Sequence, residues 1–243
     1  MENIDSGLAF ARASGMGQLP ELLSERAGET AFLKAFEREG IPVAVMDQRH
    51  IPIPLVAMME LFQSGAALLG DRTFGYEVGE KMTHRAYQAW MSYSLTAGTL
   101  ERSLRLSNAT IWAHTIGPRM DLIPLEHHVL WRYASSNHGA KQMQHADHIL
   151  PPMISYVRTY LGRSWQPDWV ELNYPRDADA AKLEDKVRVP IRFGQPGVGV
   201  PIRLSDLGCE QPTPLSMSSK VYTLRDVVAD MILKDAPEPT RSL

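Results

Sequence analysis

Apolar residues in the first half of the chain recur at the spacing of amphipathic helices. The clearest pattern follows Pro54, a residue that suits the first turn of a helix, and ends at Gly70. Its apolar positions are Leu55, Met58, Met59, Phe62, Ala66 and Leu69. Similar patterns predict short helices within residues 16–40, a helix from Phe74 to about Tyr87, and one that Thr99 caps. The first 115 residues are therefore predicted to be mainly helical.

After residue 117 the pattern changes to the alternation that is typical of strands. Within 127–133, Val129, Trp131 and Tyr133 fall on one face of a predicted strand. The other predicted elements are strands over 119–126, 169–173, 189–193 and 198–204 and helices over 139–161 and 178–186. This order, with short connections, predicts an α+β fold in which an N-terminal helical part precedes a mostly antiparallel sheet packed with helices. Pro151 and Pro152 are expected to bend or break the first of those two helices.

The end of the chain differs in composition from the rest. Residues 1–209 are predicted to form one domain, and residues 210–220 are rich in Pro and Ser, as linkers are. A short amphipathic helix over 224–233 and a polar end follow. We expect a further domain after this linker and helix.

Charge and cysteine content exclude several classes of protein. The 243 residues include 25 Lys and Arg against 28 Asp and Glu, a net charge of -3, which argues against nucleic-acid binding as the main activity of this chain. The single cysteine, Cys209, cannot form an internal disulfide, and the first residues do not resemble a signal peptide. The most apolar stretch, 51–62, is too short to cross a bilayer. A cytoplasmic protein without membrane association is predicted.

Histidines are the obvious candidates for a metal site, but their spacing does not favour one. His138, His145 and His148 are predicted to lie on the solvated side of the helix over 139–161, and no Cys or carboxylate completes a usual ligand set. His127 and His128 alternate across a strand and point to opposite faces. We predict no metal, no cofactor and, without a recognisable nucleophile motif, no enzymatic activity.

Aromatic residues give a weaker signal for a ligand pocket. Tyr87, Trp90 and Tyr93 follow one another at intervals of three, and most such rings belong to a hydrophobic core. An internal pocket would combine such apolar walls with a few polar groups. The candidate ligand-binding residues are Trp90, Tyr93, Trp112, His128 and Arg132.

Four short motifs are more specific together than singly. They are W-x-P-x-x-V at 165–170, Val189-Pro-Ile-Arg-Phe193-Gly194, Gly70-Asp-Arg-Thr-Phe74-Gly75 and Thr99-Leu100-Glu-Arg-Ser-Leu104. Together they resemble the N-terminal effector-binding domain of AraC/XylS-type transcription regulators, in the arabinose-binding-like branch typified by ornithine-utilisation regulators. The resemblance covers roughly residues 16–210.

The resemblance implies a regulatory domain that binds a small-molecule effector, forms a homodimer and reaches DNA only through a C-terminal helix-turn-helix domain. The helix over 224–233 is then expected to transmit the state of the pocket. A stand-alone sensor of a small molecule or of haem, and an enzyme without a recognisable motif, stay open as alternatives.

Overall fold

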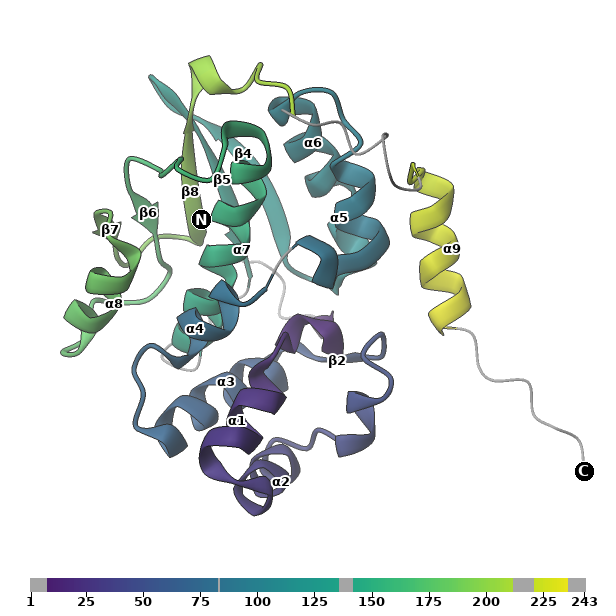
Figure 1. The fold of residues 1–243 in the computed structure, drawn as a ribbon, viewed down its shortest axis with the longest axis vertical. Coiled ribbons are helices and arrows are strands. Elements are labelled where there is room, and N and C mark those ends of the chain that lie inside the picture. Colours follow the sequence, from purple (N-terminus) through teal and green to yellow (C-terminus); the bar gives the residue numbers. More distant parts are fainter. Residues whose placement is uncertain (1–7, 83, 136–141, 212–220, 236–243) are drawn as a thin grey trace, which may run out of the picture.

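The fold was analysed in a computed structural model, which describes residues 8–82, 84–135, 142–211 and 221–235. The described residues form two hydrophobic cores. The smaller core lies among the N-terminal helices, and the larger one lies around a sheet and the longest helix. Figure 1 shows these two parts at opposite ends of the molecule.

The N-terminal part is built from short helices, as the sequence predicts. Its elements are β1 (Phe10–Arg12), the 3-10 turn η1 (Ala13–Met16), α1 (Leu19–Ala27), α2 (Glu29–Arg38), η2 (Val43–Met46), β2 (Pro52–Pro54), α3 (Leu55–Leu69) and α4 (Phe74–Glu80). The predicted helix after Pro54 is confirmed as α3, which ends at Gly70 in the left-handed conformation that glycine adopts easily.

The expected single helix from Phe74 to Tyr87 is wrong, because the chain turns after Glu80. The segment divides into α4, η3 (His84–Tyr87) and α5 (Gln88–Ser94), and α6 (Leu100–Thr110), η4 (Ile111–Ala113) and β3 (Thr115–Ile116) follow. Thr99 caps α6, since its side chain accepts a hydrogen bond from the backbone of Arg102.

The larger core surrounds a five-stranded sheet. Its elements are β4 (Arg119–Pro124), β5 (His128–Ala134), α7 (Met143–Leu161), β6 (Val170–Glu171), α8 (Ala180–Val187), β7 (Ile191–Arg192), β8 (Val198–Arg203) and η6 (Leu204–Asp206). The strand order is β4-β5-β8-β6-β7, and every pair is antiparallel except β6 with β7. The predicted α+β class with a mostly antiparallel sheet is confirmed.

A small second sheet, which the sequence pattern does not predict, joins the two parts of the molecule. β1 pairs with β2 on one side and with β3 on the other, so that Ala11 lies opposite both Ile53 and Thr115. A three-residue strand carries too little alternation to be recognised from sequence alone. This sheet holds the start of the chain against the segment that enters β4.

Helix α7 runs through the middle of the fold and contacts α3, α4 and β8. Pro151 and Pro152 lie inside it, so the expected break is not observed. Two glycines let α4 approach it closely: a Cβ at Gly75 would lie 2.1 Å from the carbonyl oxygen of Gln144, and one at Gly79 would lie 2.3 Å from that of His148. α7 is therefore covered on several sides.

The last described helix, α9 (Leu224–Asp235), confirms the helix predicted near the end of the chain. It lies beside α5 (Figure 1) and also contacts η4. Val227 is 1% exposed and belongs to the larger core. Most of the predicted linker, residues 212–220, lies outside the described part of the chain.

Candidate functional site

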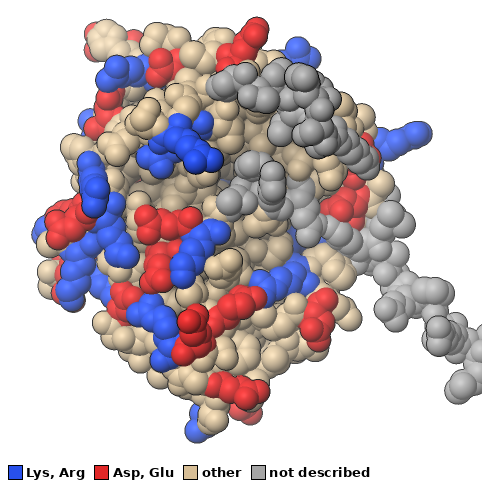
Figure 2. Space-filling model, viewed as in Figure 1, with Lys and Arg blue, Asp and Glu red and all other residues tan. Residues whose placement is uncertain are grey.

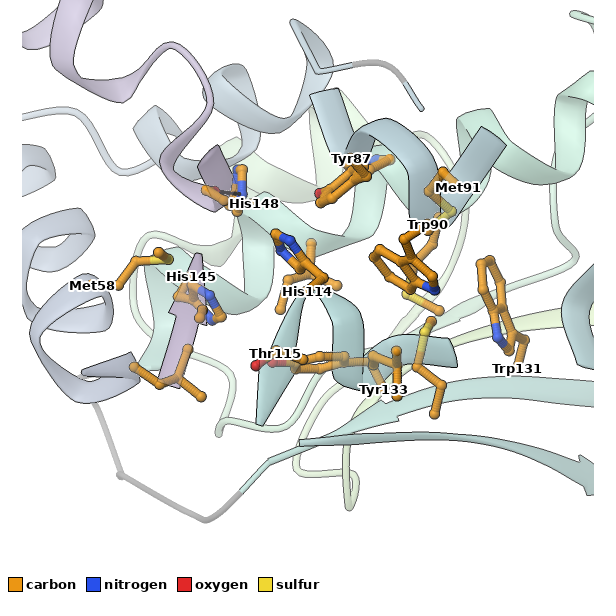
Figure 3. Close-up of a pocket in the computed structure, with 18 residues that line it drawn as sticks. Met58, Tyr87, Trp90, Met91, His114, Thr115, Trp131, Tyr133, His145 and His148 are labelled. Atoms are coloured by element: carbon orange, nitrogen blue, oxygen red, sulfur yellow. Dashed lines mark hydrogen bonds between the residues drawn. The ribbon is translucent and has the colours of Figure 1, made fainter. Parts of the chain in front are cut away.

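A cavity lies where the two cores meet. Its walls come from both of them: Ala11, Gly15, Leu55 and Met58 belong to the N-terminal part, and the remaining residues belong to α5, η3, η4, the strands and α7 (Figure 3). The space open to the centre of a water molecule is about 60 Å³. A ligand here would contact both halves of the fold at once.

One wall is a group of three rings, Tyr87, Trp90 and His114, which we call the ring cluster (Figure 3). Trp90 and His114 are stacked, with ring centroids 5.3 Å apart and an interplanar angle of 8°. Tyr87 stands edge-on to both, at 4.9 Å from His114 and 5.6 Å from Trp90. The 3-10 turns before α5 and after α6 bring these rings together, because each turn places one end of its helix beside the cavity.

The opposite wall carries two histidines of α7. His145 and His148 are 5% and 2% exposed, so their predicted place on a solvated helix face is wrong. α3 covers that face: the ring of Phe62 lies 4.5 Å from that of His148 and 5.8 Å from that of His145. His138 lies outside the described residues.

His148 has one occupied and one unoccupied ring nitrogen. Its Nε2 lies 2.9 Å from the carbonyl oxygen of Gly15, and its buried Nδ1 has no hydrogen-bond partner. Since a carbonyl oxygen only accepts, Nε2 carries the hydrogen and Nδ1 of the neutral ring is an acceptor. Buried polar atoms usually have a partner, so this nitrogen is an exception that needs an explanation.

Burial keeps these imidazoles uncharged. It lowers the pKa of His148 to about 3, and burial together with the charge of Arg12 lowers the pKa of His114 to about 3. Burial also raises the pKa of Tyr87 and of Tyr133 above the usual range of a phenol. These four groups are all neutral at pH 7.

Most hydrogen-bond donors of the wall are already used inside the protein. Nε1 of Trp90 donates to the carbonyl oxygen of Ser107 at 3.0 Å, and Nε1 of Trp131 donates to Oδ1 of Asn108 at 2.8 Å. The hydroxyl of Thr115 donates to the carbonyl oxygen of Phe10 at 2.8 Å. The rest of the surface is largely apolar and includes four methionines, Met58, Met91, Met120 and Met153.

The ring cluster also faces α9. A second, smaller hollow lies between Tyr87, Trp90 and His114 on one side and Val227, Asp230 and Met231 of α9 on the other. The same three rings therefore separate the cavity from the last described helix.

Comparison with known protein families gives a match over most of the chain. Residues 31–210 match the family described as the arabinose-binding domain of AraC transcription regulators, at their N-terminus. The chain belongs to this family. It is thus the ligand-sensing regulatory domain of an AraC-type transcription regulator.

A solved structure shares the fold of this AraC-type domain. The crystal structure of the transcriptional regulator CdpR from Pseudomonas aeruginosa superposes with a TM-score of 0.53 at 16% sequence identity, over 85% of this chain and 71% of that one. At this identity the likeness concerns the fold alone. No curated protein sequence matches the chain.

Of the five ligand-binding residues predicted from sequence, Trp90 lies in the cavity wall of the AraC-type domain. Tyr93, three residues further along α5, is partly buried and packs against the larger core. The side chain of Trp112 is 40% exposed, and its Nε1 donates to the carbonyl oxygen of Ala109. Neither lines the cavity at the junction.

The two polar candidates contact carboxylates on the other side of the sheet. Nε2 of His128 lies 2.8 Å from Oδ2 of Asp168, and an Arg132 Nη lies 2.8 Å from a carboxylate oxygen of Glu171. The structure thus brings Trp90 together with His114, His145 and His148 rather than with these two residues.

The histidines around the cavity do not form a metal cluster. No three His, Cys, Asp or Glu side chains in the described ranges are grouped so that they could hold a metal ion. The centroids of His145 and His148 are 6.0 Å apart. In the same described part of the chain, no helix is both long and apolar enough to span a membrane.

Proposed function

We propose that this AraC-type domain binds its effector in the junction cavity and reports the binding through α9. The observation that carries the proposal is the position of the ring cluster, which lines the cavity on one side and the hollow beneath α9 on the other. A ligand that moves Trp90 or His114 would change the surface on which Val227 and Met231 pack.

The mechanism is a shift between two packing states of α9. A ligand shifts such an equilibrium only by as much as it binds one state better than the other. Residues of both cores line the cavity, so a ligand would favour the state in which the two cores and the ring cluster fit around it. α9 would then pass this difference to the DNA-binding part of a regulator.

The wider role follows from the family. We expect a cytoplasmic homodimer of this domain, 1–209, whose segment 210–243 leads to a helix-turn-helix domain that contacts DNA, and we expect no enzymatic activity. On the face that Figure 2 shows, described Lys and Arg side chains alternate with Asp and Glu, which agrees with DNA contacts made elsewhere. Light scattering of the purified chain measures the dimer directly.

Two matched glycine variants test the coupling between cavity and helix without a ligand. A Cβ at Gly15 would lie 3.3 Å from Nε2 of His114, so Gly15→Ala narrows the cavity and presses on the ring cluster. Gly98→Ala is the control, because a Cβ there meets nothing within 4 Å. Hydrogen exchange of the backbone amides of 224–235 is the readout.

We expect the amides of α9 to exchange several-fold faster in Gly15→Ala and at the wild-type rate in Gly98→Ala. Unchanged exchange over 224–235 together with altered exchange over 111–116 would show that the cavity and α9 are independent, and would overturn the proposal. Should Gly15→Ala fail to fold, Trp90→Phe applies the same test, since it alters the ring cluster directly.

A further inference from the structure

The chemistry of the cavity wall restricts the class of ligand, and this inference rests on the proposed function. Among the described residues that line the cavity, none is Asp, Glu, Lys or Arg. An ion that entered would lose its hydration without gaining a partner of opposite charge, which is strongly unfavourable. His114 and His148 are neutral at pH 7, so they do not offer a charge that could pair with an ionic ligand.

The wall is also a poor match for a sugar. Several hydroxyl groups would need several free donors and acceptors, whereas the indole N–H groups of Trp90 and Trp131 and the hydroxyl of Thr115 already donate inside the protein. Each unpaired buried hydroxyl would lose its bonds to water. The cavity therefore favours a ligand with few polar groups.

His148, one of the residues that line the cavity, has a buried ring nitrogen without a hydrogen-bond partner. Nδ1 of His148 is a buried acceptor without a partner, since Nε2 donates to Gly15. A ligand that brings one O–H or N–H group to this nitrogen would complete its hydrogen bonding. A ligand without a donor would leave it unpaired.

The remaining surface suits an aromatic ring. Tyr87, Trp90 and His114 offer ring faces and edges, and methionine sulfurs make favourable contacts with aromatic rings. In another protein an apolar cavity of about 150 Å³ holds benzene. The cavity of about 60 Å³ is smaller, and the flexible side chains of Met58, Met91 and Met153 can make room by changing rotamer.

We propose that the ligand class of this cavity is a small, uncharged aromatic compound with a single hydrogen-bond donor, which it gives to Nδ1 of His148. A phenol is the simplest member of the class. The ring occupies the space between the ring cluster and α7, and the hydroxyl group points to His148.

Calorimetric titration of the chain with four compounds of similar size tests this assignment. Phenol has the ring and the donor, toluene has the ring alone, benzoate adds a charge, and L-arabinose replaces the ring by hydroxyl groups. The proteins are the wild type, His148→Leu, which removes the Nδ1 acceptor without supplying another, and His127→Gln, a control at a histidine side chain that is 79% exposed.

We expect phenol to bind the wild type and His127→Gln about tenfold more tightly than toluene, as one buried hydrogen bond predicts. In His148→Leu the preference for phenol should fall below about threefold, while the affinity for toluene stays unchanged. Benzoate and L-arabinose should not bind at concentrations up to about 10 mM. A purely structural role of His148 would weaken phenol and toluene alike.

Three results would overturn the assignment. They are equal affinity of the wild type for phenol and toluene, tighter binding of benzoate or L-arabinose than of phenol, and no binding by any of the four. None of these three results contradicts the proposed function, because hydrogen exchange of α9 in the glycine variants tests the proposed function separately. If His148→Leu does not fold, the ¹⁵N resonance of Nδ1 in the wild type decides: phenol must shift it and toluene must not.

Discussion

Trp90 and His114 lie in parallel planes, with centroids 5.3 Å apart and an interplanar angle of 8°, although they come from separate helical segments. Both rings line the cavity between the two cores, and both line the hollow under α9. A displacement of one ring cannot leave the other unaffected, because stacked rings are in van der Waals contact. This pair is the physical connection between the site and the end of the described chain.

Val227 is the most buried of the described side chains of α9, and we expect it to anchor the helix. Its side chain is 1% exposed, and we expect Val227→Asp to release the helix, because an unpaired carboxylate in that position loses its hydration. Hydrogen exchange over 224–235 should then approach the rate of an unfolded peptide. Val221→Asp, at a residue that is 59% exposed, is the matched control and should leave the exchange as it is. Protected α9 amides in Val227→Asp would contradict the anchoring role.

Arg72 holds three segments together through a buried network. It contacts Asp147 of α7 at 2.5 Å and Asp177 at 2.7 Å, and it donates to the hydroxyl of Tyr174 at 3.1 Å. The side chains of Arg72 and Asp147 are 7% and 0% exposed. Arg72→Ala is expected to lower the free energy of unfolding by about 3–5 kcal/mol, because it leaves a buried carboxylate unpaired.

The control for this prediction is Arg105→Ala. Arg105 pairs with Glu101 one turn away on α6, and the two side chains are 67% and 45% exposed, so its loss should cost about 0.5 kcal/mol or less. Urea unfolding followed by circular dichroism gives both values. Similar losses in the two variants would show that the network of Arg72 is not a structural anchor.

His148 makes the stability of the domain depend on pH. Its pKa is about 3 in the folded chain, whereas that of an unfolded histidine is about 6.5. Between these values only the unfolded chain binds the proton, so this contribution to the free energy of unfolding is complete above pH 6.5 and is lost as the pH falls. The slope is at most about 1.4 kcal/mol per pH unit.

Urea unfolding of His148→Gln and of the wild type between pH 4 and 8 isolates that contribution. The comparison is needed because burial raises the pKa of Asp147 to about 6, which gives a slope of opposite sign in both proteins. We expect the difference in unfolding free energy between the two proteins to shrink steadily below pH 6.5. A difference that does not vary with pH would mean that His148 takes up a proton in the folded chain.

The sequence predicts the elements of the fold well where the pattern is long. The helix after Pro54, the strand over 127–133 and the mostly antiparallel sheet all follow from the spacing of apolar residues. The pattern fails for β1, β2 and β3, which have two or three residues each and depend on strand partners as far apart as Phe10 and Ile116. Pairing of this kind is decided by tertiary structure, which a local pattern does not contain.

The candidate site is harder to predict, because residues that line it come from both cores. Trp90 is predicted as a ligand-binding residue, and the structure places it in the cavity wall. His145 and His148 are predicted to be surface residues, because the apolar residues of α7 lie on one face of the helix and these two histidines lie outside it. Their burial follows from α3 and from the close approach of α4. Gly75 and Gly79 are one helical turn apart in the sequence, and such a pair allows another helix to approach closely. This spacing is the sequence signal that could have predicted the burial of the two histidines.

Hydrogen exchange of α9, with and without phenol at ten times its dissociation constant, measures whether a ligand of the cavity acts on α9. Phenol is expected to alter the exchange of 224–235 along with that of the ring-cluster segments, and toluene at equal concentration is expected to have a smaller effect. Altered exchange around the cavity with unchanged exchange over 224–235 would contradict the claim that this domain reports its ligand through α9.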